Sequence, residues 1–106
     1  MIDILIAGLM ATHRHASRSV ESMEKTLESI NGDTVKECKS TIKDFSIMLE
    51  GYRMVEKASK HLLNEHNVIV MPNQTYYSKL EQKVIPYETL GETLNKNHYF
   101  DVNSNE

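Results

Sequence analysis

The sequence predicts an all-α fold: a long antiparallel helical hairpin, coiled-coil-like, that assembles into a helical bundle and carries a C-terminal extension. Three observations predict it. An apolar stripe with alternating three- and four-residue steps runs from residue 2 to residue 30, and a second runs from residue 35 to residue 52. The turn sequence Asn31-Gly32-Asp33 separates the two stripes. We expect residues 1–66 to form the hairpin and residues 67–106 the extension.

The first stripe is apolar at every position except His13. Its members are Ile2, Ile6, Leu9, His13, Ala16, Val20, Met23, Leu27 and Ile30. A helix over these residues is about 40 Å long. Gly32 fits a left-handed cap at its C-terminal end. Thr34 and Glu37 have the spacing of a capping box that opens the second helix, with Asp33 as the competing cap.

The second stripe shifts its position on the helix after Tyr52. Its members are Val35, Cys38, Ile42, Phe45, Leu49 and Tyr52, followed after a shortened step by Val55, Ala58 and Leu62. A short loop makes the two helices antiparallel neighbours, so that facing positions should add up to about 65. This register sets Ala16 against Leu49, and His13 against Tyr52 as one polar layer. On the N-terminal side of His13, the apolar residues of the first helix would face polar residues of the second. We therefore expect the open end of the hairpin to splay or to pack on something else.

The second helix has a further apolar face, roughly opposite Phe45 and Leu49. A helix that is apolar on two faces is normally covered on both, and small residues on this face would let another helix approach closely. Two coverings remain open: the C-terminal region of the same chain, or a second hairpin in a four-helix bundle. The predicted interface residues are Ile47, Gly51, Met54, Ala58, Leu5, Tyr76 and Tyr77.

The extension shows weaker patterns than the hairpin. Residues 68–72 are an apolar run ended by a proline, which predicts an extended segment. Tyr76, Tyr77, Leu80 and Val84 have the spacing of a short amphipathic helix that Pro86 would end. The two tyrosines either stay exposed for an interface or pack back onto the second helix. The last residues are polar, and we expect a mobile tail.

Few residues suggest chemistry. His13 is interpreted as a core histidine bonded to Tyr52, with a pH-sensitive interface as the alternative. His61 and Glu65 are four residues apart and could offer two metal ligands, but a zinc site needs about four, so we expect no metal. Cys38 lies on the inward stripe and should be an inert thiol. Glu21, Glu24 and Glu28 form an acidic ridge that we interpret as a solvated face.

Composition narrows the function classes. The formal net charge is −3 and no basic stripe is present, so we expect no nucleic-acid partner. The single cysteine excludes an intrachain disulfide, and no apolar run approaches the length of a membrane span. The N-terminal stretch contains Asp3 and lacks a basic region before it, which does not fit a signal peptide. The expected location is the cytoplasm, for a chain that begins at Met1 and is plausibly complete.

The leading hypothesis is a small non-enzymatic regulator, inhibitor or assembly factor. It would act as a helical homo-oligomer and bind another protein, without a cofactor and without a membrane partner; a viral or mobile-element origin is compatible with its small size. The alternative is a helical oligomer that binds or processes a ligand or nucleotide at a site between subunits. The suspects for that site are Glu21, Glu24, His61 and Glu65. A third possibility is a structural role, which polymerisation would reveal.

Overall fold

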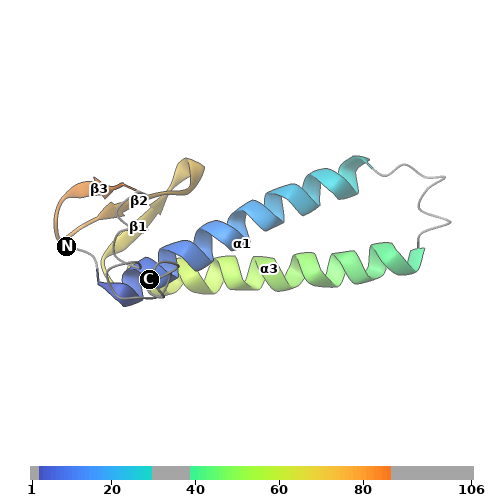
Figure 1. The fold of residues 1–106 in the computed structure, drawn as a ribbon, viewed down its shortest axis with the longest axis horizontal. Coiled ribbons are helices and arrows are strands. Elements are labelled where there is room, and N and C mark those ends of the chain that lie inside the picture. The colour runs from blue at the N-terminus through green and yellow to red at the C-terminus, as the bar shows by residue number, and fades with distance from the viewer. Residues whose placement is uncertain (1–2, 30–38, 87–106) are drawn as a thin grey trace, which may run out of the picture.

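The computed structural model describes residues 3–29 and 39–86, in which two long helices are followed by a small sheet. Helix α1 (Ile4–Ser29) and helix α3 (Lys39–Glu65) pack against each other. Figure 1 shows that they run in opposite directions, with the sheet at the end where α1 begins and α3 ends. The predicted pair of packed helices is confirmed. The prediction of a purely α-helical fold is wrong, because the sheet accompanies the helices.

Local structure explains the start of α1 and the end of α3. The Asp3 side chain accepts a hydrogen bond from the backbone N–H of Ile6 at 2.9 Å and so caps the start of α1. Asn67 follows the end of α3 with a φ of 66°, the left-handed conformation typical of a helix C-terminal cap. The predicted turn with its caps, Gly32, Asp33 and Thr34, lies outside the described residues, as does Cys38.

The inward face of α1 agrees with the predicted stripe from His13 to Val20 and departs from it nearer the N-terminus. Its buried residues are Ala7, Met10, His13, Ala16 and Val20, whereas the predicted Ile6 and Leu9 are only partly buried. The inward face of α3 departs from the prediction after Tyr52. Its buried residues are Leu49, Ser59 and Leu63, whereas Val55, Ala58 and Leu62 are exposed. The predicted shortened step is therefore wrong, and α3 keeps one regular stripe along its length.

A polar residue makes this regular stripe possible. Ser59 occupies an inward position that the apolar pattern had skipped. Its hydroxyl donates to the backbone carbonyl of Val55 at 2.7 Å, one turn earlier in the same helix. The buried hydroxyl is thereby satisfied without a partner from α1. Apolar periodicity alone passes over such a residue and follows exposed Val55, Ala58 and Leu62 instead.

The sheet is antiparallel with strand order β1-β2-β3. It consists of β1 (Val68–Met71), β2 (Thr75–Ser78) and β3 (Lys83–Ile85), and the 3₁₀ turn η1 (Pro72–Gln74) joins the first two strands. The predicted extended segment at residues 68–72 is confirmed as β1. The predicted short helix after Thr75 is wrong, because these residues form β2, a turn and β3. Tyrosine, valine and isoleucine favour strands, and this preference prevails over the helical spacing.

The core lies where the sheet meets the two helices. One buried cluster combines Ala7 and Met10 of α1, Leu63 of α3, Val68 of β1, Tyr76 of β2 and Ile85 of β3. The open end of the hairpin, which was expected to splay or to pack on something else, therefore packs on the sheet. Figure 1 shows that the two helix axes move apart toward the end of the hairpin that is farthest from the sheet. The buried core of the hairpin thus includes residues of all three strands.

Candidate functional site

The most prominent surface feature is an apolar stripe on α3 that faces away from the core. We call it the outer stripe, and its members are Ile47, Met48, Gly51, Met54, Val55, Ala58 and Leu62. All seven residues are exposed; the side chains of Ile47 and Met54 are 62% and 65% exposed. The stripe contains the four α3 residues predicted for the interface. Its other three members were not predicted, because Val55 and Leu62 were assigned to the inward face and Met48 to neither face.

The outer stripe is continuous. At 100° per residue, its seven members fall within an arc of about 120° on the helix surface. No charged residue of α3 falls inside this arc between residues 47 and 62, and Asp44 and Glu65 bound it at the two ends. Glu50 and Lys57 lie along one edge. An uninterrupted exposed apolar surface with a polar rim is typical of a binding interface.

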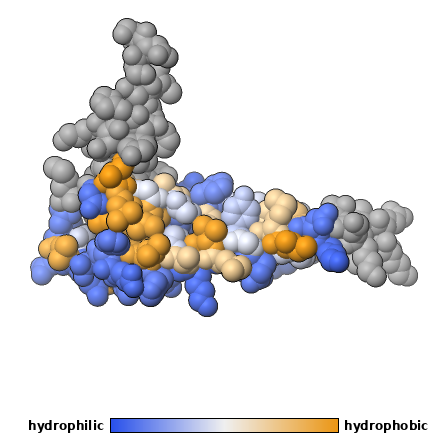
Figure 2. Space-filling model, turned by 90° about the horizontal axis from the view of Figure 1, so that it is seen from below, coloured by the Kyte–Doolittle hydropathy of each residue, from blue (hydrophilic) through white to orange (hydrophobic). Residues whose placement is uncertain are grey.

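The described part of the extension leaves the outer stripe open. Figure 2 shows hydrophobic side chains gathered in a band along the long axis, on the side of the molecule where α3 lies in Figure 1. Residues 68–85 instead pack on the core at one end of the helix pair. The described residues 67–86 of the C-terminal region therefore do not cover the outer stripe.

Gly51 adds to the openness of the outer stripe. A Cβ atom placed on Gly51 would meet nothing within 4 Å. No contact among the described residues therefore requires a glycine at this position, although glycine costs a helix interior about 1 kcal/mol relative to alanine. The missing side chain leaves a shallow notch in the middle of the stripe, next to Met54.

The other predicted interface residues have three different environments. Leu5 is exposed near the start of α1. Tyr77 is half-buried on the outer face of the sheet, where it pairs across the strands with Ile69 and Val84. Tyr76 is only 1% exposed and belongs to the core. Its assignment to an exposed interface is wrong, because alternate residues of a strand point to opposite faces and Tyr76 points inward.

The predicted polar layer exists with a different partner. His13 is 3% exposed, and its Nδ1 atom lies 2.8 Å from the hydroxyl oxygen of Tyr76. Tyr52, the predicted partner, instead meets the edge of the His15 ring, with ring centroids 5.8 Å apart. The partner differs because strand β2 brings Tyr76 to α1. A prediction based on the two helices alone could not include a residue of the sheet.

The environment of His13 favours its neutral form. Burial lowers the pKa of His13, the Lys60 ammonium lowers it further, and the Glu56 carboxylate partly opposes these effects. A neutral imidazole can accept or donate one hydrogen bond at Nδ1, and Tyr76 supplies the matching hydroxyl group. The pair therefore serves as a buried polar link between α1 and β2.

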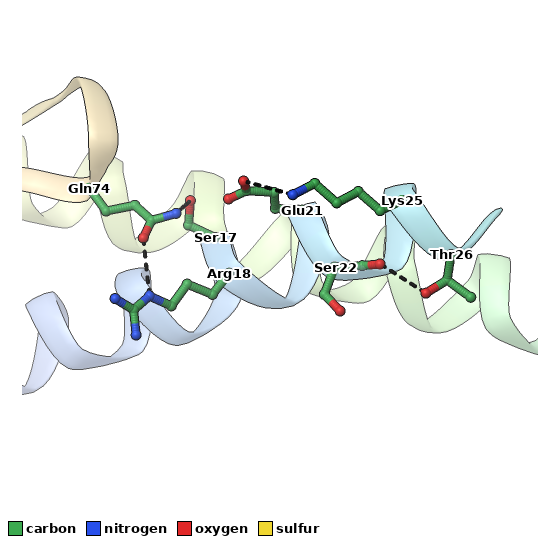
Figure 3. Close-up of polar contacts among 7 residues, drawn as sticks. All are labelled: Ser17, Arg18, Glu21, Ser22, Lys25, Thr26 and Gln74. Carbon is green, nitrogen blue, oxygen red and sulfur yellow. Dashed lines mark hydrogen bonds and ion pairs between the residues drawn. The ribbon is translucent and has the colours of Figure 1, made fainter. Parts of the chain in front are cut away.

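A polar cleft lies between the two helices and the turn η1. It measures about 580 Å³, and its walls include Ser17 and Glu21 of α1, Lys57 and Lys60 of α3, and Gln74. Gln74 has a φ of 60° and is held to α1 at both ends of its amide group. Figure 3 shows its nitrogen donating to the Ser17 hydroxyl and its oxygen accepting from the Arg18 Nε, each at 3.3 Å. The cleft has the size of a small-molecule site.

The other suspected ligand residues make exposed polar contacts with neighbouring side chains. Glu24 binds Arg53 at 2.9 Å across the two helices. Glu21 pairs with Lys25, 3.8 Å away along α1; Figure 3 draws this second pair. His61 lies 3.1 Å from Glu65 on the surface of α3. Within residues 3–29 and 39–86, no three acidic, histidine or cysteine side chains are grouped so that they could hold a metal ion.

Comparisons with known proteins add no further information. Searches against protein-family models, curated proteins and solved structures gave no significant match. Within the part of the chain that the structure describes, neither helix has the length and apolarity to cross a membrane.

Proposed function

We propose that this protein is a small non-enzymatic protein-binding module that associates with copies of itself through the outer stripe of α3. The observation that carries the proposal is the continuous exposure of seven apolar residues along one side of a helix whose opposite side is already packed. Burying each large side chain of the outer stripe would contribute roughly 1–3 kcal/mol. A second hairpin is a partner of the right shape, because two helix pairs that meet through such faces form a four-helix bundle.

We further propose that the self-associated protein binds another protein, as a regulator, inhibitor or assembly factor. The sheet has a second, smaller apolar row on its outer face, formed by Ile69, Tyr77 and Val84. Tyrosine is favoured at protein interfaces because it buries a large area with little loss of entropy. In a self-associated protein this row remains available at each sheet, where it supports binding of a further protein.

Sedimentation velocity over a range of protein concentrations tests the self-association. The substitution Met54→Lys puts a charge into the outer stripe of each copy and should weaken association about a hundredfold, or about 3 kcal/mol. Leu80→Lys is the matched control, because Leu80 is 77% exposed on the turn between β2 and β3. If wild type stays monomeric at all concentrations, or if both variants associate like wild type, the proposal fails. Open-ended polymers would instead support the structural role.

Ligand binding is the second candidate function, and the polar cleft supports it. Lys57 and Lys60 face this cleft and also a neighbouring hollow of about 450 Å³. Two ammonium groups beside the small apolar wall of Val70 suit an anionic ligand with an organic part, such as a nucleotide. Thermal unfolding with and without ATP and magnesium tests this candidate. A rise in Tm that Lys60→Glu removes and Lys79→Glu keeps would favour it, whereas an unchanged Tm in wild type would oppose it.

A further inference from the structure

We propose that two copies of the chain pair through α3 in antiparallel orientation, with a two-fold axis that passes between Tyr52 and Arg53 of each helix. This inference rests on the proposed self-association and specifies its geometry. In such a pair, a residue on one helix faces a residue on the other so that the two residue numbers add up to about 105. Size, charge and helix length each point to this register.

The sizes of the side chains match in this register. Ile47 faces the partner's Ala58, and Gly51 faces the partner's Met54; symmetry repeats both contacts. Each layer therefore combines a large residue with a small one, as interdigitated packing requires. In the single chain, a Cβ atom added at Gly51 would meet nothing within 4 Å. In the pair, the partner's Met54 side chain occupies this space.

A parallel pairing lacks this match. Equal residue numbers would then lie level, so that Gly51 would meet the partner's Gly51 and Met54 would meet the partner's Met54. Small residues would leave a gap in one layer while large residues would crowd the next. Empty space between packed helices loses both burial and dispersion contacts. The order of large and small residues along α3 therefore favours the antiparallel pair.

Charges along the edge of the outer stripe agree with the same register. Glu50 and Lys57 are exposed and lie on the same edge, seven residues apart. In the antiparallel pair, Glu50 comes beside the partner's Lys57, and symmetry creates a second such pair. On the other side of the stripe, Met48 comes beside the partner's Val55. Edge residues of paired helices set partner choice and orientation in this way.

The position of the axis also suits the length of α3. The helix spans Lys39–Glu65, so an axis between Tyr52 and Arg53 lies close to its middle. The two helices then overlap along almost their whole length and leave no apolar end open. A two-fold contact that uses the same surface on both copies closes on itself. The geometry thus points to a dimer rather than to a filament.

A charge-swap experiment in the full-length chain tests the register. Glu50→Lys and Lys57→Glu should each weaken the dimer about tenfold, because each variant places like charges opposite each other twice. When the two variants are mixed in equal amounts, opposite charges face each other again. The mixture should therefore form heterodimers about as tight as the wild-type dimer. The double variant E50K/K57E should regain wild-type affinity for the same reason.

The matched control reverses an ion pair away from the outer stripe. Glu21 and Lys25 lie 3.8 Å apart on the surface of α1, so E21K and K25E change the net charge without touching the proposed edge. Both should dimerise like wild type. The mixing step also separates the register from the loss of the Glu50–Arg53 contact within α3, which a second copy cannot restore.

The possible failures can be told apart. A mixture no tighter than its weaker component overturns the register, and wild-type dimerisation would then still support the proposed function. A wild type that sediments as a monomer overturns both. If that monomer also loses folding stability with Met54→Lys but not with Leu80→Lys, the chain itself covers the outer stripe. Circular dichroism of each variant confirms that it has folded.

Discussion

The Nδ1 atom of His13 lies 2.8 Å from the hydroxyl oxygen of Tyr76, and this contact joins α1 to the sheet across 63 residues of chain. The two rings also meet edge to face, with centroids 5.6 Å apart. The Tyr76 hydroxyl lies within 3.3 Å of the backbone carbonyl of Met10, to which it can donate. One buried tyrosine therefore ties together the first helix and the middle strand.

Removal of the Tyr76 hydroxyl should destabilise the protein. Tyr76→Phe keeps the ring in the core but leaves the buried His13 nitrogen without its partner, which should cost about 1–3 kcal/mol. Tyr77→Phe is the control, since Tyr77 lies one residue away on the other face of the sheet. Its effect should stay within about 0.5 kcal/mol. Urea unfolding of both variants measures the difference, and equal effects would contradict this account of the layer.

The lowered pKa of His13 predicts a loss of stability in acid. Because the pKa is lower in the folded state than the ordinary value of 6.5, the folded state binds this proton less readily than the unfolded state does. The contribution is complete above pH 6.5 and is lost as the pH falls from there through the folded-state pKa. In urea unfolding, the stability difference between wild type and His13→Gln should therefore shrink between pH 7.5 and pH 5.

The exposed His61 provides the control for this pH dependence. It lies on the surface of α3, outside the buried layer. His61→Gln removes a histidine from the chain but leaves His13 and Tyr76 in place. Its stability difference from wild type should change less between the two pH values than that of His13→Gln. A larger change for His61→Gln would contradict the assignment of the acid sensitivity to His13.

The shared core predicts that a truncation in α3 weakens the whole fold. Leu63 is fully buried among residues of α1 and all three strands, so Leu63→Ala should cost about 2–5 kcal/mol. Leu80→Ala, on the exposed turn, should stay within about 0.5 kcal/mol. Urea unfolding followed both by helical circular dichroism and by tyrosine fluorescence measures the effect. Two separate transitions would contradict a single core.

Both described glycines lie inside helices, and the single chain should tolerate alanine at both. A Cβ atom at Gly8 or at Gly51 meets nothing within 4 Å. Gly8→Ala should therefore raise the free energy of unfolding by up to about 1 kcal/mol, since alanine loses less backbone entropy than glycine. Gly51→Ala should do the same for the dissociated chain, but it should weaken the proposed dimer because the added methyl group meets the partner's Met54. Thermal unfolding at protein concentrations below association measures both shifts, and a lower Tm in either variant would show that a contact within the chain crowds that position.

The helices were predictable because their signal is repeated. Nine positions with heptad spacing predicted the first helix, and the inward side of α1 follows them from His13 to Val20, although Ala7 and Met10 take the inward positions in place of Ile6 and Leu9. The apolar residues after Tyr52 do not indicate which side of α3 faces inward. Ser59 takes an inward position there, and its hydroxyl group donates to a backbone carbonyl of its own helix. Apolar Val55, Ala58 and Leu62 were therefore assigned to the wrong side.

The sheet and the polar layer were harder to predict for a different reason. Tyr76, Tyr77, Leu80 and Val84 are compatible with one face of a helix and also with two short strands around a turn, so spacing alone cannot decide. The decision comes from packing: β1 covers the open end of the hairpin, and β2 then adds Tyr76 to the core. The partner of His13 depended on that long-range contact and was therefore missed.

The antiparallel pairing of α3 is tested most directly by distances between identical positions of two copies. Nitroxide labels at position 43, 50, 57 or 64, one at a time in a chain with Cys38→Ser, all lie on the same exposed edge of α3. Pulsed electron paramagnetic resonance then measures each separation. The register predicts separations along the helix axis of about 8 and 14 Å at positions 50 and 57, and about 29 and 35 Å at positions 43 and 64. Equal distances at all four positions, or no dipolar coupling at any of them, would contradict it.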